Sequence, residues 1–349
     1  MWYNGGIKGF QKKGGVFVKK IINNPDLVVD EMLEGMVAAH PEYIRKLDNA
    51  DVLVRKNSPI KGKVALVSGG GSGHEPAHGG YVGEGMLDAA VAGAVFTSPT
   101  PDQIYEAIKA VDGGNGVLLV IKNYSGDVMN FEMAKDMADM EGIKVESVIV
   151  NDDVAVENST FTAGRRGIAG TVFVHKIAGA KAETGASLDE VKSVAEKVIN
   201  NVGSMGMALS SCIVPAAGKP NFTLGEDEVE IGMGIHGEPG THREKLKSAD
   251  EITEHLLNKI LEDIKVESGE EVAVMINGLS STPLMELYIV NRRVSELLKE
   301  KGIKVHKTFV GEYMTSLEMA GFSISLLKLD DELKELLDAK ADTPAFKML

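Results

Sequence analysis

The chain has 349 residues, of which 44% are hydrophobic and 25% are charged, and this length is enough for two domains. Its formal net charge of −14 argues against a nucleic-acid-binding protein, which would carry a basic face. No apolar run approaches the roughly 20 residues of a membrane span and no signal peptide is visible. We therefore expect a cytoplasmic protein with no membrane partner.

The first 17 residues differ from the rest of the chain and are expected to form an extension outside the fold. They are either a purification tag or the product of a mis-assigned start, because codons for residues 13–15 can spell a ribosome-binding sequence ahead of a GTG start at Val18. In the remainder we expect an N-terminal domain at residues 18–190 and a C-terminal domain at residues 191–349.

Apolar, strand-like runs alternate with helical patterns in the first domain. Strands are predicted at residues 64–68, 117–121 and 145–150, and helices at residues 101–111 and 130–141. Near-continuous apolar strands separated by helices of this length indicate βαβ units. The first domain is therefore predicted to be Rossmann-like, with a largely parallel sheet and helices on both faces. Its ligand site is expected beyond the carboxyl ends of the strands.

The second domain follows a helix predicted at residues 187–200, which starts with a capping box of Ser187 and Glu190. The domain boundary is placed near residues 185–203. Further strands are predicted at residues 205–214, 272–276, 305–310 and 322–327, and helices at residues 249–264 and 283–299. This alternation predicts a second, smaller α/β layer domain, so the whole chain is assigned to the α/β class.

Two short segments set a histidine among glycines and follow it with Glu and Pro. Residues 69–76 read Gly-Gly-Gly-Ser-Gly-His-Glu-Pro, and residues 232–240 read Gly-Met-Gly-Ile-His-Gly-Glu-Pro-Gly. Glycine lets a backbone turn sharply or approach a ligand closely. His74 and His236 are therefore interpreted as groups presented to a substrate, in one site assembled from two parts of the chain.

Two other interpretations of the first glycine segment are weaker. His74 and His78 match the H-E-x-x-H pattern of zinc proteases, but that chemistry needs a stable helix. Glycines flank the motif on both sides and no third ligand is obvious, so no metal is expected. Residues 69–73 lack the ending of a P-loop and the spacing of a dinucleotide fingerprint. Backbone amides that hold a small polar ligand are the better interpretation.

Charged side chains near the predicted strand ends are further candidates. Asp127 lies in a polar loop after a strand, where a substrate contact is as favoured as a solvated loop aspartate or a helix N-cap. Lys122 ends an apolar strand, where a charge is costly unless it faces a site or water. Arg165 and Arg166 form either a surface pair or a contact for an anion or a partner. The two aspartates at residues 152–153 are expected in a solvated turn.

Longer stretches of the chain resemble one known family. They are residues 64–76, 96–102, 122–127, 214–220, 234–240 and 321–328. From about residue 19 to the C-terminus, the chain resembles the substrate-binding subunit of dihydroxyacetone kinase. The resemblance implies a phosphotransferase subunit that binds dihydroxyacetone covalently, as a hemiaminal on His236. It would then present the hydroxyl for phosphorylation to dihydroxyacetone phosphate.

The resemblance also implies roles for other residues. His74 and Asp127 match the family's acid–base pair, and Gly71 and Lys122 match its substrate-contact positions. A bond between an imidazole nitrogen and a carbonyl carbon would select short carbonyl compounds over polyols, which cannot form it.

Family members of this size act with a separate subunit, so partners are expected. The resemblance implies that ADP and Mg²⁺ lie on that phosphoryl-donor subunit, which a sugar phosphotransferase relay recharges, and that this chain binds no cofactor. Arg165 and Arg166 would help to receive the donor, and the chain would form a homodimer. A second hypothesis is a non-catalytic, dihydroxyacetone-sensing coactivator of a transcriptional regulator, although His74 and Asp127 favour the kinase.

Overall fold

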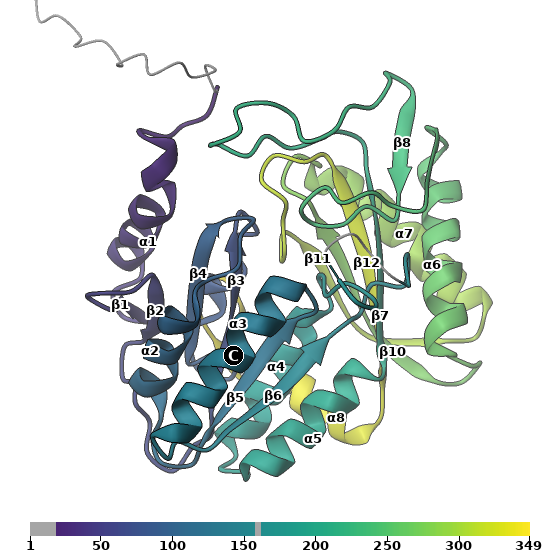
Figure 1. Cartoon of the computed structure of the whole chain (residues 1–349). Coiled ribbons are helices and arrows are strands. Elements are labelled where there is room, and N and C mark those ends of the chain that lie inside the picture. Colours follow the sequence, from purple (N-terminus) through teal and green to yellow (C-terminus); the bar gives the residue numbers. More distant parts are fainter. Residues whose placement is uncertain (1–18, 158–161) are drawn as a thin grey trace, which may run out of the picture.

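A computed structural model of the protein describes residues 19–157 and 162–349. The predictions about residues 1–17 and Val18 lie outside these described residues. Two six-stranded sheets with flanking helices make up the molecule (Figure 1), which confirms the α/β class predicted from the sequence. In the described part of the chain, no helix is both long and apolar enough to span a membrane.

The first sheet has the strand order β1-β2-β4-β3-β5-β6. Its strands are β1 (Ile44–Lys46), β2 (Val52–Arg55), β3 (Ala65–Ser72), β4 (Ala89–Val95), β5 (Val117–Lys122) and β6 (Val145–Val150). The pairings of β3 with β4, β3 with β5 and β5 with β6 are parallel, whereas β1–β2 and β2–β4 are antiparallel. The sheet is therefore mixed. Strands β3 and β5, whose carboxyl ends lie next to candidate site residues, belong to its parallel part.

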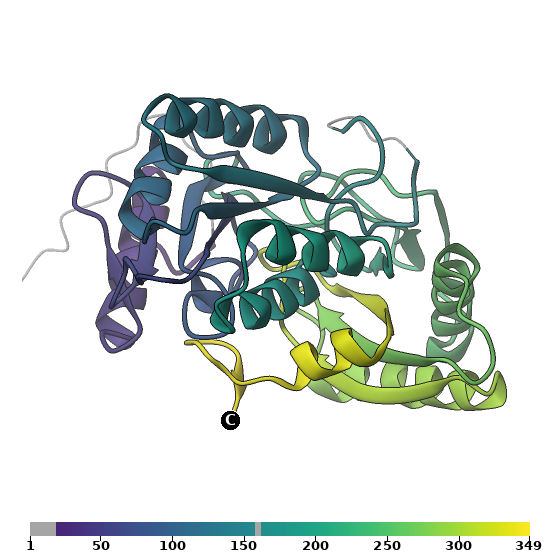
Figure 2. The same ribbon diagram turned by 90° about the horizontal axis from the view of Figure 1, so that it is seen from below.

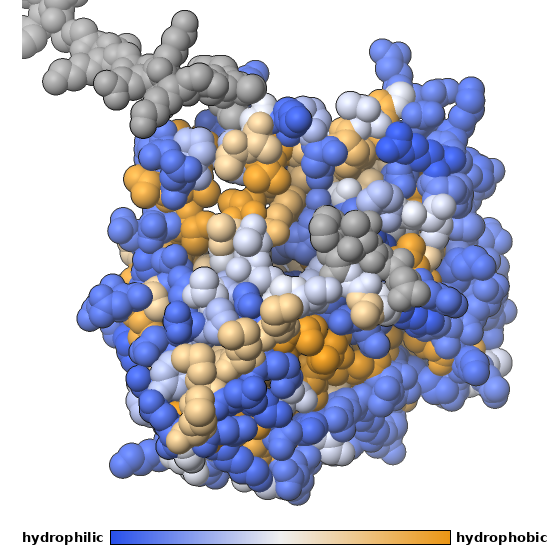
Figure 3. Space-filling view, viewed as in Figure 1, coloured by the Kyte–Doolittle hydropathy of each residue, from blue (hydrophilic) through white to orange (hydrophobic). Residues whose placement is uncertain are grey.

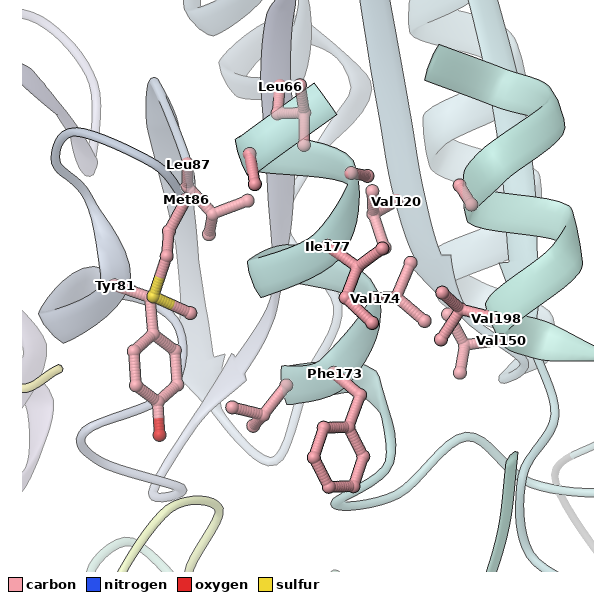
Figure 4. Packing of buried hydrophobic residues seen from close by; sticks show 14 of the residues in the cluster. Leu66, Tyr81, Met86, Leu87, Val120, Val150, Phe173, Val174, Ile177 and Val198 are labelled. Atoms are coloured by element: carbon pink, nitrogen blue, oxygen red, sulfur yellow. The ribbon is translucent and has the colours of Figure 1, made fainter. Parts of the chain in front are cut away.

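Helices cover both faces of the first sheet (Figures 1 and 2), as predicted. They are α1 (Val28–Ala39), α2 (Pro101–Val111), α3 (Ser125–Met140), α4 (Thr171–Glu183) and α5 (Leu188–Ile199). Successive side chains of a strand point to opposite faces. On β5, Leu119 therefore packs in a core with Phe131 of α3, while Val120 packs with Val174 and Ile177 of α4 (Figure 4).

The second sheet has the strand order β11-β10-β12-β7-β8-β9. Its strands are β7 (Val202–Ala208), β8 (Glu228–Ile231), β9 (His242–Lys245), β10 (Glu271–Gly278), β11 (Lys304–Gly311) and β12 (Gly321–Leu329). The pairing of β10 with β11 is parallel and the other four are antiparallel. α6 (Ala249–Ile264) and α7 (Leu284–Glu300) pack on one face, and Ala273 and Met275 on the other face join the core of the first half.

The C-terminal residues return to the first half of the molecule. After α8 (Asp331–Asp338), β13 (Ala341–Asp342) and β14 (Lys347–Met348) form a small sheet, and η1 (Pro25–Leu27) and η2 (Gly79–Tyr81) are short 3₁₀ helices. Phe346 packs in the same core as Tyr81, and the Asp342 amide donates to the Glu84 carbonyl at 2.9 Å. The proposed division at residue 190 falls inside α5, which packs against β6 of the first sheet.

Several elements agree closely with those predicted from the sequence. α2 and α6 begin and end at the predicted residues. The predicted capping box is present at α5, where the Ser187 amide donates to Glu190 Oε2 at 2.8 Å. α4 was not predicted because it is buried on nearly every side and so shows no amphipathic period.

Three predicted boundaries are wrong, each for a physical reason. Gly69 lies inside β3 rather than in a loop. A Cβ there would be 2.4 Å from the Val91 carbonyl oxygen, so the glycine permits β3 to approach β4 this closely. Asp127 lies in the first turn of α3, which begins five residues earlier than predicted. β7 ends at Ala208. The amides of the next two residues, Leu209 and Ser210, both donate to the Ala320 carbonyl, so the regular pairing with β12 stops there.

Replacing Gly69 should destabilise the first sheet. Gly69→Ala would place a methyl group against the β4 backbone, and we expect a loss of about 1–3 kcal/mol in the free energy of unfolding, as for an overpacked core. Gly35→Ala is the matched control, since a Cβ at Gly35 in α1 meets nothing within 4 Å. That change should stabilise the protein by up to about 1 kcal/mol. Urea unfolding of both variants measures the difference, and equal effects would contradict the close approach.

Candidate active site

His74 lies just beyond the end of β3 and is fully buried. Its Nδ1 is 2.7 Å from the Thr315 carbonyl oxygen, which can only accept, so Nδ1 carries the hydrogen and Nε2 is unprotonated in the neutral ring. Nε2 has no hydrogen-bond partner among the described residues. Burial lowers the pKa of His74 well below 6.5, and the nearby His236 and Lys122 lower it further. His74 is therefore a neutral imidazole with a free Nε2 lone pair.

His236 lies in the loop between β8 and β9 and is fixed by Glu238. The two carboxylate oxygens of Glu238 accept from the His236 Nδ1, at 2.7 Å, and from its backbone amide, at 2.9 Å. Burial alone would raise the pKa of Glu238, but the contact with His236 and the nearby Arg166 lower it to about 2. An ionised carboxylate only accepts, so it holds the hydrogen of His236 on Nδ1 and leaves Nε2 free.

The two histidines from opposite halves of the molecule are in contact. Their ring centroids are 4.8 Å apart, with an interplanar angle of 69°. Phe96 stacks on His74 at 5.1 Å and meets the His236 ring edge-on at 5.1 Å. The ring centroid of Tyr124 is 4.7 Å from that of His236. The sequence prediction that the two glycine segments build one site is consistent with this arrangement.

A short stretch that the sequence analysis did not identify holds these rings together. We call residues 315–317 the bridging segment. The amides of Thr315 and Leu317 donate to the carbonyls of His74 and Gly73, at 3.1 and 2.8 Å. The hydroxyl of Ser316 donates to the carbonyl of the residue before His236. These contacts are made mostly by backbone atoms, which explains why no sequence motif marks the segment.

Lys122 and Asp127 form a buried ion pair next to the glycines of β3. Lys122 Nζ is 3.6 Å from Asp127 Oδ2, and Ser98 Oγ donates to the other carboxylate oxygen. Gly70 has φ +154°, and a Cβ there would lie 2.4 Å from Lys122 Nζ, so any other residue would displace the ammonium group. A Cβ at Gly71 would meet the Thr97 amide nitrogen at 2.5 Å. Glycine is thus required where the Lys122–Asp127 pair and its surroundings approach the backbone of β3.

The zinc-protease interpretation does not agree with the local structure. His74 lies in a bend and residues 75–78 form a turn, so the motif is not on a helix. His78 is directed to another partner, because its Nδ1 is 3.0 Å from Nε2 of the buried His175. Within residues 19–157 and 162–349, no group of three His, Cys, Asp or Glu side chains is placed to hold a metal ion.

Two expectations about charged residues are corrected. Arg166 is fully buried and forms an ion pair with Asp153, so it cannot be a surface contact for a partner. Asp152 is buried as well, and its carboxylate accepts from the amides of Ile168 and Gly170. The two aspartates are therefore not in a solvated turn. They are buried because neighbouring amides and a guanidinium group satisfy their charges.

Taken together, the fold and site define an α/β protein in which two histidines, each with its Nδ1 held by an acceptor, meet where its two sheets meet. Residues 34–345 match the family model of the Dak1 domain. The chain is 57% identical, over 94% of its length and 100% of the relative's, to the PTS-dependent dihydroxyacetone kinase 1, dihydroxyacetone-binding subunit DhaK, of Listeria innocua serovar 6a. The chain therefore belongs to the Dak1 family, which confirms the assignment to dihydroxyacetone kinases made from the sequence.

Solved structures agree with this family membership. The dihydroxyacetone kinase of C. freundii matches with a TM-score of 0.88 and 35% identity, over 95% of this chain and 61% of that one. The dihydroxyacetone kinase operon co-activator Dha-DhaQ matches with a TM-score of 0.85 and 38% identity, over 90% of this chain and 97% of that one. The fold is thus shared by a kinase and by a co-activator.

The ionised state of Glu238 should be visible in the pH dependence of stability. Its pKa is about 2 in the folded chain against an ordinary 4.5, so its contribution is present above pH 4.5 and is lost as pH falls toward 2. We expect the stability difference between the parent protein and Glu238→Gln to shrink by about 2 kcal/mol between pH 6 and pH 3.

Urea unfolding at the two pH values measures this difference. Glu84→Gln is the control, because Glu84 makes a half-exposed surface ion pair with Lys340. Its difference from the parent should stay small at both pH values. A Glu238→Gln difference that is constant with pH would contradict an ionised, strongly paired Glu238.

Proposed function

We propose that the chain binds dihydroxyacetone as a covalent hemiaminal on Nε2 of His236 and presents a hydroxyl of the bound ketone for phosphoryl transfer. The observation that carries the proposal is the contact of His236 Nδ1 with a Glu238 carboxylate oxygen at 2.7 Å, which places the hydrogen of the neutral ring on Nδ1 and leaves Nε2 unprotonated. A neutral imidazole with a free nitrogen lone pair is a nucleophile for a carbonyl carbon. The full-length similarity to dihydroxyacetone-binding subunits supports the choice of ketone.

The bond-forming step balances with groups that the site contains. The Nε2 lone pair of His236 bonds to the carbonyl carbon, and the electron pair of the C=O bond moves to oxygen. The ring becomes cationic on addition and transfers its Nδ1 proton to Glu238, which releases it to solvent, while the oxygen takes up one proton from solvent. The Lys122 ammonium group, which has no hydrogen-bond partner among the described residues, is the cation that faces the developing negative charge. No water leaves.

The remaining site residues fit the transfer step. Asp127 accepts a hydrogen bond from the terminal hydroxyl and takes its proton as the oxygen–phosphorus bond forms and the bond to the leaving ADP breaks. Neutral His74 contacts the substrate oxygens and passes the proton on through its free Nε2. Lys122, 3.6 Å from Asp127, balances the carboxylate charge. Phosphoryl transfer depends mainly on such positioning and charge stabilisation.

The phosphoryl group comes from a separate subunit that carries ADP and Mg²⁺, and this chain acts as a homodimer. The relative's description as a dihydroxyacetone-binding subunit supports the assignment of ketone binding and phosphoryl donation to separate chains. Apolar side chains gather over α3, the helix that begins beside Asp127 (Figure 3). Exposed there are Met129, Met133 and Met140, and flexible methionines suit a docking surface. This surface replaces Arg166 as the candidate contact for the donor.

A second candidate function is a non-catalytic coactivator that senses dihydroxyacetone. The similarity to the co-activator Dha-DhaQ supports it, at 38% identity and a TM-score of 0.85. Such a protein would form the adduct without turnover. The buried Lys122–Asp127 pair, which adduct formation does not need, favours the kinase.

His236→Ala should abolish the covalent adduct. Native mass spectrometry of the parent with dihydroxyacetone should show an added mass equal to one whole ketone, because addition expels no water. The His236→Ala variant lacks the nucleophile and should show none. His242→Ala is the matched control, since His242 is an exposed histidine a few residues away, and it should form the adduct as the parent does. An undiminished adduct in His236→Ala would reject the proposed nucleophile.

Asp127→Asn should separate binding from turnover. This variant keeps His236 and Glu238, so it should still form the adduct, while phosphorylation by the charged donor subunit should fall by about 10²–10⁴-fold with loss of the base. Asp189→Asn is the control, because Asp189 is a largely exposed aspartate of α5, which packs on the opposite face of the first sheet from α3. Full turnover in Asp127→Asn would exclude the role given to Asp127. Adduct without any turnover in the parent would favour the coactivator.

A further inference from the structure

Arg166 holds both ends of the loop that carries His236. Its Nη2 donates to the Gly232 carbonyl at 2.7 Å, and its Nη1 donates to the Pro239 carbonyl at 3.3 Å. His236 lies between these two residues, so one guanidinium group ties the start of the loop to its end. The planar fork of donors in arginine suits this bridging role, which a lysine ammonium group cannot reproduce.

Arg166 is itself rigidly held by the first half of the molecule. Its Nε donates to Asp153 Oδ2 at 2.7 Å, and Nη2 lies 2.6 Å from the same oxygen. Both side chains are essentially inaccessible to solvent, at 0% and 1% exposure, so water does not compete for these bonds. Three acceptors from two parts of the chain therefore determine where the guanidinium group lies.

The guanidinium group also lies next to Glu238. A Cβ at Gly234 would be 2.8 Å from Arg166 Nη1 and 2.1 Å from Glu238 Oε2, so the two groups approach over a glycine that has no side chain to separate them. The positive charge of Arg166 favours the ionised form of Glu238, which keeps the hydrogen of His236 on Nδ1.

We infer that Arg166 is a positioning residue for the nucleophile: it sets the loop conformation and the charge of Glu238, and through them leaves His236 Nε2 free to add to a carbonyl. The inference rests on the proposed function of His236. Arg166 touches no reacting atom, so its effect passes through Glu238 and the loop. Arg165 offers the contrast, because its ion pair with Asp263 lies at the surface and does not contact the loop.

The test compares Arg166→Met, Arg166→Lys and Arg165→Met in the full-length protein. Adduct formation is titrated with dihydroxyacetone by native mass spectrometry, the tautomer of His236 is read from ¹⁵N chemical shifts of the imidazole without ketone, and unfolding in urea checks that each variant is folded. We expect Arg166→Met to bind the ketone about tenfold more weakly or worse, the scale of one lost charge-assisted hydrogen bond, and to populate both tautomers. Arg165→Met should match the parent in both readouts.

Arg166→Lys separates charge from geometry and remains informative if Arg166→Met does not fold. It keeps a cation near Glu238 but loses the fork, so we expect weaker adduct formation with a smaller change in the tautomer. A folded Arg166→Met or Arg166→Lys that forms adduct as the parent does, with unchanged ¹⁵N shifts, overturns the inference. Absence of adduct in the parent would instead overturn the proposed function, while the ¹⁵N comparison would still test the role of Arg166.

Discussion

The site depends on the bridging segment, residues 315–317, which joins the two halves of the protein where the histidines meet. Its amides donate to the carbonyls of Gly73 and His74, and its Thr315 carbonyl accepts from the His74 ring. Each histidine by itself lies on a glycine-rich stretch with wide conformational freedom. Buried hydrogen bonds are costly to leave unmade, so the bridging segment restrains two such stretches to one arrangement with ring centroids 4.8 Å apart.

The two rings differ in the charges and hydrogen-bond partners around them. Burial, His236 and Lys122 lower the pKa of His74 and outweigh the Thr315 carbonyl and Glu238, which raise it, so the ring is held neutral. His236 faces a carboxylate instead, which suits a ring that must become cationic when it adds to a carbonyl. This difference in hydrogen-bond partners supports the proposed roles, in which His236 is the nucleophile and His74 the proton carrier.

The sequence predicted what depends on periodicity and on local chemistry. The helices α2 and α6, the Ser187 capping box and the pairing of the two glycine-set histidines all follow from such patterns. It could not predict α4, whose burial on all sides removes the amphipathic signal, or the role of the Thr315 carbonyl, since every residue has a carbonyl group. Burial of Arg166 was missed because adjacent arginines usually lie at the surface.

The remaining polar atoms of the site point to its ligand. His74 Nε2, Lys122 Nζ and the Tyr124 hydroxyl are buried without hydrogen-bond partners in the described chain. A buried polar group that lacks a hydrogen bond costs about 1–3 kcal/mol. A three-carbon ketone with two hydroxyls brings one oxygen to each of three such groups, but a polyol of the same length would do so equally well. Polar contacts would therefore explain affinity for a small oxygen-rich molecule, and only the covalent bond that we propose for His236 would explain selection of the carbonyl.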